Sequence, residues 1–220
     1  MGKLIVIDGL DASGKETQVK LIFEKLKKEY DKVIRLDFPN YDKPYCEPVK
    51  MYLNGEFGKN PDDVNAYAAS TFFAVDRYAS YMSEWKKYYD EDYIIICDRY
   101  ASSNPIYQLT KLKEEEKQAY LDWVYDFEFE KLSIPKPDMV IFIDMPPEYS
   151  FKLIEKRAKE TDHNVDIHEQ NKNFLIQCYE SALYCADYYK WEKINTIKDN
   201  EIMSREEISQ MIYETIKKGI

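Results

Sequence analysis

The amino-terminal segment constrains this chain most strongly, because an apolar stretch runs straight into a glycine-containing loop and then into a helical pattern. Residues 4–7 predict a short buried strand, and apolar positions at spacings of three and four predict a helix over residues 15–30. Between them lies GLDASGKET, residues 9–17, which fits the spacing G-x-x-x-x-G-K. A strand, a tight loop and a helix in this order are typical of an α/β sheet and argue against all-helical and all-strand folds.

The loop at residues 9–17 has the chemistry of a phosphate cradle. Its glycines let consecutive backbone N–H groups turn toward phosphate oxygens, and the amino terminus of the next helix adds a favourable dipole. Lys15 supplies a positive charge for the outer phosphates. Glu16 stands where Ser or Thr would offer a hydroxyl to Mg²⁺, so direct or water-mediated metal binding stays open. The predicted nucleotide-binding residues are Gly9, Leu10, Asp11, Ala12, Ser13, Gly14, Lys15, Glu16 and Thr17.

Beyond this loop, strand-length apolar runs alternate with longer helical patterns. Strands are predicted at residues 33–38, 93–97, 139–143 and 191–197, in addition to the first. Helices are predicted at residues 61–88, 114–132, 146–159, 168–189 and from 204 onward, with Asn60 capping the helix that begins at Pro61. We therefore expect a parallel sheet covered by helices on both faces, in one domain over residues 1–220.

Charge and composition exclude several classes of partner. The chain has 41 acidic and 31 basic side chains, a net charge of −10, which opposes binding along a nucleic acid polymer. No run approaches the roughly 18 apolar residues that a membrane helix needs. The four cysteines lack CxxC or metal-finger spacing, which favours reduced thiols in a cytoplasmic protein. The partners expected are small molecules.

A second group of candidate residues follows the strand at residues 93–97. Asp98 ends this strand, where many phosphate-binding proteins direct an acid at the metal or its waters. Arg99 adjoins it, and its planar guanidinium suits phosphate oxygens. A local ion pair is the alternative interpretation. Asp144 also ends a strand, but no basic residue adjoins it, so it ranks as the lesser candidate.

Two further segments suggest ligand contacts. Phe73 and Arg77 stand four residues apart on a predicted helix, so both project from one face and could offer an aromatic plate and a donor to a planar ligand. The alternative is that Phe73 belongs to the core. The polar segment at about 157–169 fits a lid that closes over phosphates or, equally, a solvated connection between helices. His163 and His168 within it are predicted to be exposed loop residues.

Together these segments resemble the thymidylate kinases, a family of P-loop nucleoside monophosphate kinases. The resemblance implies a P-loop NTPase fold, a five-stranded parallel sheet with helices on both faces and a short lid. It implies transfer of the γ-phosphoryl group of ATP to dTMP, with Mg²⁺, for dTTP synthesis. The matching segments keep the family's order: GLDASGKETQ at 9–18, FPNY at 38–41, YLNGEFG at 52–58, FFAVDR at 72–77, DRYASSNPIYQ at 98–108, PKPDMVIFIDMPPE at 135–148 and DIHE at 166–169.

The same resemblance implies roles for particular residues. Lys15 contacts the outer phosphates of ATP, and Arg99 bridges donor and acceptor phosphates. Asp98 lies near Mg²⁺, and Asp11 meets the sugar or the metal environment of the acceptor phosphate. The acceptor pocket is made by Phe38 and Tyr41 as lining, Phe73 stacked on thymine, Arg77 and Asn104 at the base edge, and Tyr107 against the 2′ position.

Departures from the family pattern leave some questions open. Ala12 stands where some members carry a loop arginine, and members without it use lid cations, for which Arg157 and then Lys159 are the candidates here. The lid has no arginine directly after Asp166, so the acting cation is not fixed. A kinase for another base is one alternative, and a non-catalytic nucleotide-binding protein is another; a guanine-specific form of the latter needs an N-K-x-D element, which does not occur. The family implies a homodimer.

Overall fold

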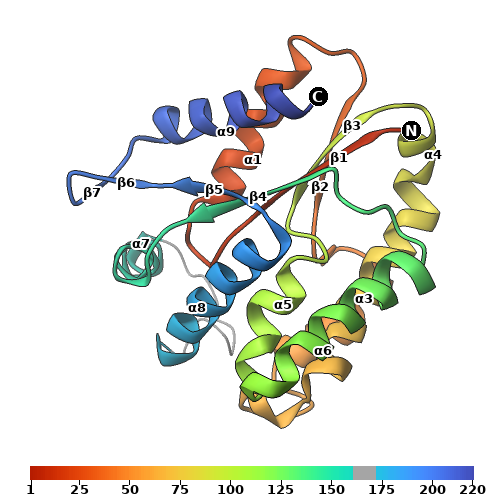
Figure 1. Cartoon of the computed structure of the whole chain (residues 1–220), viewed down its shortest axis with the longest axis vertical. Helices are drawn as coiled ribbons and strands as arrows, with labels where there is room; N and C mark the ends of the chain where they lie inside the picture. Colours follow the sequence, from red (N-terminus) through yellow and green to blue (C-terminus); the bar gives the residue numbers. More distant parts are fainter. Residues whose placement is uncertain (161–171) are drawn as a thin grey trace.

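The structure is a computed structural model that describes residues 1–160 and 172–220, with side chains left undescribed at 155–160. Within these residues, the predicted strands form a five-stranded parallel sheet in the order β2-β3-β1-β4-β5 (Figure 1). A parallel sheet covered by helices is thus confirmed. The strands are β1 (Lys3–Asp8), β2 (Val33–Asp37), β3 (Ile94–Asp98), β4 (Met139–Asp144) and β5 (Glu192–Asn195).

The central strand β1 explains why the apolar run at the amino terminus is continuous. Its neighbours are β3 and β4, so that Ile5 lies opposite Ile96 on one side and Met139 on the other. Both faces of β1 are covered, and successive side chains enter different cores. Ile5 packs in the cluster that contains α1, whereas Leu4 packs in the cluster that contains Trp85.

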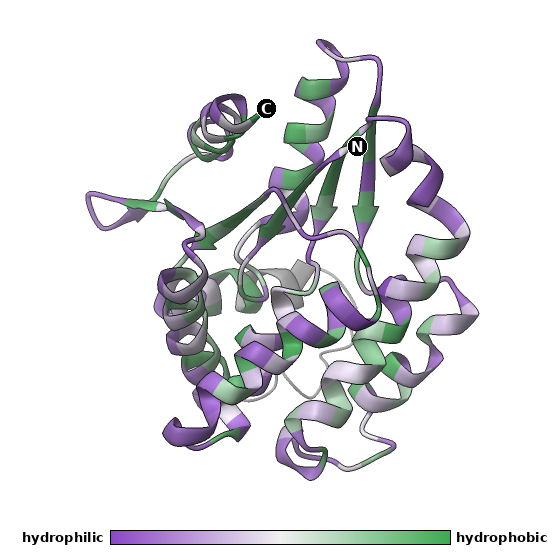
Figure 2. Ribbon diagram, turned by 45° about the vertical axis from the view of Figure 1, so that its right-hand side comes forward, coloured by the Kyte–Doolittle hydropathy of each residue, from purple (hydrophilic) through white to green (hydrophobic). Residues whose placement is uncertain are grey.

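Helices cover the two faces unequally. On one face α1 (Lys15–Lys27) packs beside α9 (Arg205–Gly219), and apolar residues of both helices share one core cluster with the sheet. Figure 2 colours hydrophobic positions green along both helices. The remaining helices lie toward the other face and the carboxyl ends of the strands. They are α2 (Glu47–Leu53), α3 (Ala66–Ser80), α4 (Lys86–Asp90), α5 (Ser103–Gln108), α6 (Glu114–Tyr125), α7 (Pro147–Glu160) and α8 (Lys172–Tyr189).

The predicted helix at residues 61–88 was wrong in its start and its continuity. Asn60 and Asp63 do form a capping box, but it closes only the 3₁₀ turn Pro61–Asp63. Val64 is extended, and α3 begins at Ala66, where the Asn65 side chain accepts a hydrogen bond from the N–H of Ala68. A π-helical turn, Tyr81–Trp85, then separates α3 from α4.

Other differences concern short elements. The helix predicted at 114–132 consists of α6 and a π-helical segment, Asp126–Lys131. The short helices α2 and α5 were not predicted, because six or seven residues give too few turns for a periodicity to be visible. The last predicted strand stops at Asn195, and a small antiparallel pair follows it, β6 (Ile197–Lys198) with β7 (Glu201–Ile202).

Candidate active site

The glycine-containing loop connects β1 to α1 at the carboxyl edge of the sheet. Gly14 has φ 85°, a left-handed conformation that glycine adopts without steric cost. A side chain at Gly9 would place its Cβ 2.9 Å from Ser13 Oγ and 3.1 Å from the carbonyl oxygen of Ile143. Ser13 Oγ itself is buried and has no hydrogen-bond partner among the described residues. A tight loop with an unused hydroxyl is what phosphate oxygens require.

Lys15 is buried at the start of α1, and its Nζ donates a hydrogen bond to the carbonyl oxygen of Leu10 at 2.6 Å. Burial and the nearby Arg99 guanidinium lower the pKa of Lys15 to about 8, although neighbouring carboxylates act in the opposite direction. The ammonium group is therefore only partly compensated by the protein. An anionic ligand would stabilise it.

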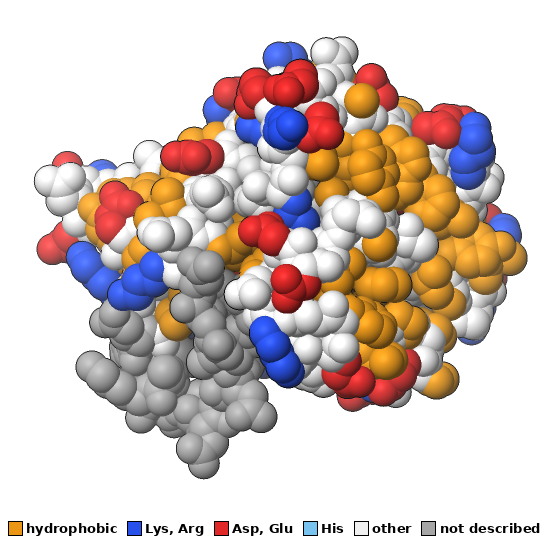
Figure 3. Space-filling view, turned by 90° about the horizontal axis from the view of Figure 1, so that it is seen from below, with side chains coloured by type: hydrophobic (Ala, Val, Ile, Leu, Met, Phe, Trp, Pro, Cys, Tyr) orange, Lys and Arg blue, Asp and Glu red, His pale blue; other side chains and the backbone are white. Residues whose placement is uncertain are grey.

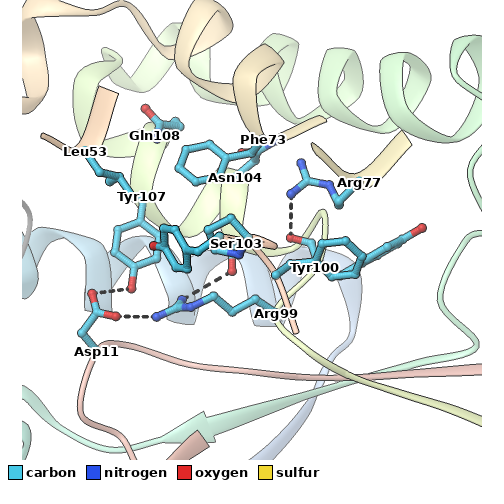
Figure 4. A pocket seen from close by; sticks show the side chains of 13 residues that line it. Asp11, Leu53, Phe73, Arg77, Arg99, Tyr100, Ser103, Asn104, Tyr107 and Gln108 are labelled. Carbon is cyan, nitrogen blue, oxygen red and sulfur yellow. Dashed lines mark hydrogen bonds and ion pairs between the residues drawn. The ribbon is translucent and has the colours of Figure 1, made fainter. Parts of the chain in front are cut away.

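Arg99 connects this loop to a neighbouring cavity. Its Nη2 forms an ion pair with Asp11, and its Nη1 lies 3.3 Å from the carbonyl oxygen of Gly9. The guanidinium also lies 5.4 Å from the ring centre of Tyr107, whose hydroxyl donates to Asp11 Oδ2 at 2.9 Å. Figure 4 shows these three side chains meeting at one edge of the cavity. A single arginine therefore contacts both the loop and the cavity.

The cavity is open to solvent, and the space between its walls, open solvent included, is about 550 Å³. All eight residues predicted to bind the acceptor lie in its wall, although they come from separate segments of the chain. Five more residues complete the wall. The lining residues are Asp11, Phe38, Pro39, Tyr41, Leu53, Phe73, Arg77, Arg99, Tyr100, Ser103, Asn104, Tyr107 and Gln108.

Neighbouring side chains hold the residues on the α3 side of the cavity. Phe73 packs edge-on against Tyr52, with ring centres 6.1 Å apart. Arg77, one turn later, is only 2% exposed and forms a two-pronged ion pair with Glu128, at 2.7 Å and 2.5 Å. Burial opposes the charge of Arg77, but Glu128 outweighs it and raises the pKa of the guanidinium. Asn104 also donates to Glu128, at 2.8 Å.

Two carboxylates, Asp98 and Asp8, lie near the loop in addition to Asp11 within it. Burial raises the pKa of Asp98, while Lys15 and Arg99 lower it. Asp8 was not predicted, although it is the last residue of β1 as Asp98 is the last residue of β3. It is fully buried and accepts hydrogen bonds from the hydroxyls of Ser102 and Ser103, which fix the start of α5.

Gln108 was also not predicted. It is 1% exposed, lines the cavity, and its Oε1 has no hydrogen-bond partner among the described residues. The sequence signal was weak, because Gln108 ends α5, a helix too short to be recognised. Figure 4 places it beside Phe73 and Leu53 at the far end of the cavity from Asp11.

Some predicted residues do not join the cavity. Asp144 accepts a hydrogen bond from the Tyr179 hydroxyl at 2.7 Å. The lid was predicted at about residues 157–169, and its residues 161–169, His163 and His168 included, lie outside the described residues. Arg157 and Lys159 belong to α7, but the structure describes only their backbone and not their side chains.

Comparisons with known proteins agree with the family resemblance of the sequence. A family model described as thymidylate kinase matches residues 7–212. A thymidylate kinase from Mycobacterium tuberculosis is 31% identical over 159 residues, covering 71% of this chain and 72% of the relative. One from Plasmodium falciparum is 28% identical over 200 residues, covering 91% and 85%. A solved thymidylate kinase from Candida albicans shares the fold, with TM-score 0.70, 21% identity, and 99% and 92% of the two chains covered. This chain belongs to the thymidylate kinase family.

Proposed function

We propose that this protein transfers the γ-phosphoryl group of ATP to dTMP, giving ADP and dTDP. The contact of Arg99 with both the phosphate loop and the acceptor cavity carries the proposal. An oxygen of the dTMP phosphate attacks the γ-phosphorus, and the bond from that phosphorus to the bridging oxygen of ADP breaks. Arg99 exchanges its contact with Asp11 for phosphate oxygens and neutralises the charge between donor and acceptor.

Alignment and charge account for the catalysis. The acceptor oxygen is already anionic, so the reaction needs no strong base. Lys15 lies at the amino terminus of α1, where the outer phosphates of ATP are expected, and burial together with the nearby Arg99 lowers its pKa. The buried hydroxyl of Ser13 is available to a phosphate oxygen.

Magnesium fits the carboxylates of this site. No group of three or more His, Cys, Asp or Glu side chains that could hold a metal occurs among the described residues. Mg²⁺ is commonly bound by one or two carboxylates, with phosphates and waters completing its coordination. Asp11 and Asp98 would hold it, with Glu16 exposed to solvent. The bound ion would neutralise phosphate charge.

The cavity wall suits a thymine deoxynucleotide. Phe73 offers a ring face for stacking, while Arg77, Asn104 and Gln108 offer polar groups to the base edge. Tyr107, held by Asp11, crowds the 2′ position and favours deoxyribose. Phe38 and Tyr41 close the side of the cavity.

The proposal is tested by offering Mg-ATP with dTMP, dUMP, dCMP, AMP or GMP and measuring ADP release. We expect the highest kcat/KM with dTMP. A clear preference for another monophosphate would support a related kinase instead. Nucleotide binding without any dTMP-dependent turnover would support a non-catalytic protein and reject the transferase.

The proposal includes a homodimer in the cytoplasm. No helix among the described residues is long and apolar enough to cross a membrane. Exposed apolar side chains form a stripe along α3 and the turn after it, and Figure 3 shows hydrophobic side chains gathered on that side of the molecule. We call this stripe the α3 face; it comprises Tyr67, Val75, Tyr78 and Met82. A second copy covering the α3 face would remove these side chains from water.

The proposal also treats residues 1–220 as one nucleoside monophosphate kinase domain, with a lid at about 157–169. Arg157 is the proposed lid cation. It would add positive charge at the transferred phosphoryl group once ATP is bound.

A further inference from the structure

Glu128 lies behind the acceptor cavity and contacts two of its polar residues. It belongs to the π-helical segment Asp126–Lys131, is fully buried, and does not line the cavity itself. One carboxylate oxygen accepts from Arg77 Nε, and the other accepts from both Arg77 Nη2 and Asn104 Nδ2. The two groups at the proposed base edge are therefore held by one carboxylate.

The contacts of Asn104 determine which way its amide points. Nδ2 lies 2.8 Å from Glu128 Oε1 and 3.3 Å from the carbonyl oxygen of Ser70. A carboxylate and a carbonyl can only accept hydrogen bonds, so both positions require the NH₂ group. Both hydrogens of Nδ2 are then used, and Oδ1, which accepts no hydrogen bond within the described part of the chain, is left for the ligand.

Arg77 is held so that it offers hydrogen-bond donors, whereas Asn104 offers an acceptor. Nε and Nη2 donate to Glu128, and Nη1 donates to the Tyr100 carbonyl oxygen at 3.4 Å. A guanidinium has five N–H groups, so donors remain for a ligand in the cavity that Arg77 lines. The wall thus presents a donor from Arg77 and an acceptor from Asn104.

Thymine and uracil match this pair. They present an acceptor, O4, next to a donor, N3–H, whereas cytosine presents a donor, its amino group, next to an acceptor, N3. Cytosine in the same place would put donor against donor and acceptor against acceptor, which leaves buried polar groups unpaired. We propose that Glu128 is a positioning residue that sets this preference by turning the Asn104 amide oxygen, beside the Arg77 donor, toward the base.

This inference rests on the proposed function, and its test separates the two. Steady-state kinetics with dTMP, dUMP and dCMP are measured for the wild type and for Glu128→Gln. The new amide can donate as well as accept, so only the longer contact with the Ser70 carbonyl oxygen still favours the NH₂ group of Asn104 at this position. In the variant, we expect KM for dTMP and for dUMP to rise together, with KM for ATP nearly unchanged. The dTMP-to-dCMP ratio of kcat/KM should fall by about tenfold or more, the value of one hydrogen bond.

The outcomes are distinct. If the wild type does not phosphorylate dTMP, the proposed function fails. If it does, and folded Glu128→Gln keeps the wild-type dTMP-to-dCMP ratio or loses all substrates equally, Glu128 does not set the preference. Asp138→Asn is the matched control, because Asp138 accepts bonds from Lys3 and from the N–H of Leu4 away from the cavity. Its ratio should equal that of the wild type.

Loss of Glu128 leaves a buried arginine unpaired, so folding must be checked by thermal melting. If Glu128→Gln does not fold, Glu128→Asp carries the same test, since it keeps the charge but is one methylene shorter. The wild type gives a further measurement that needs no variant. In ¹⁵N NMR, the Nδ2 protons of Asn104 should exchange slowly both without and with dTMP; fast exchange without ligand would contradict the orientation.

Discussion

At the scale of single residues, the site joins a buried lysine and a half-buried arginine to nearby carboxylates. Burial, together with the nearby Arg99 guanidinium, lowers the pKa of Lys15 to about 8. Arg99 in turn pairs with Asp11, which also accepts from Tyr107. Phosphates entering such a site replace protein carboxylates as partners of the cations, so binding and charge neutralisation occur together.

Replacing Arg99 with alanine should reduce kcat by about 100-fold or more, since one preorganised charge contact to a reacting group commonly has this value. KM for ATP should change less, because Lys15 and the loop remain. Arg35→Ala is the control, because Arg35 pairs with Asp37 on the outer strand β2. Steady-state kinetics measure kcat for both variants. An Arg99→Ala variant with kcat within twofold of the wild type would refute the bridging role.

The lowered pKa of Lys15 predicts a pH dependence. Lys15 carries its charge below its pKa, so kcat/KM for ATP, which reports the free enzyme, should fall as pH rises through about 8. Bound phosphates raise the pKa, so kcat should hold to higher pH. Burial also lowers the pKa of Lys111 to about 8, outside the cavity wall, so Lys111→Met should keep the wild-type profile. A profile that stays flat well above this pH would contradict the assignment.

At the scale of elements, α3 carries two of the proposed base-binding residues, and its start determines where they lie. Phe73 and Arg77 occupy one face because they are four residues apart. The π-helical segment after α6 supplies Glu128, which forms an ion pair with Arg77 and does not itself line the cavity. Such segments recur at functional sites, because the inserted residue changes which side chains face a neighbouring element.

The capping residue of α3 gives a test of this element. Asn65→Ala should lower the free energy of unfolding by about 1 kcal/mol, because Asn65 Oδ1 accepts from the N–H of Ala68 at 2.9 Å. Asn60→Ala should have a smaller effect, since Asn60 caps only a three-residue turn. Urea denaturation of both variants measures the difference. Equal losses would mean that both asparagines stabilise one continuous helix.

At the scale of the whole molecule, the negative net charge of the chain does not describe the local charge of the site. A net charge of −10 disfavours polyanions, whereas buried Lys15 and half-buried Arg99 lie where the carboxyl ends of parallel strands meet, and Arg99 shares the cavity wall with buried Arg77. The α3 face lies on the outside of the element that forms the cavity wall, so a second copy bound there would support α3 from behind.

The proposed homodimer predicts the effect of charges on this face. Wild-type protein should sediment as a dimer, and the double variant Tyr78→Glu and Met82→Glu should sediment as a monomer, because buried like charges on both copies are costly. Tyr184→Glu, an exposed aromatic position on α8, serves as the control and should leave the dimer intact. A monomeric wild type, or a double variant that stays dimeric, would contradict this interface.

The sequence by itself determined the features whose residues are close together in the chain. The loop at residues 9–17, the pair Phe73 and Arg77, and the strand end at Asp98 and Arg99 all follow from local spacing, because strand and helix geometry fix how near neighbours are oriented. Local signals were ambiguous where two caps competed, as at Asn60 and Asn65, since both can accept hydrogen bonds from the next turn.

Only the tertiary structure decided which distant groups meet. Glu128 lies 51 residues from Arg77 and 24 from Asn104, and periodicity shows that a residue is buried without showing what it contacts. The same holds for Asp8 beneath Ser102, and for Gln108 in the cavity wall. A buried polar side chain must find a partner or a ligand, and the packing of elements alone determines which of these lies within reach.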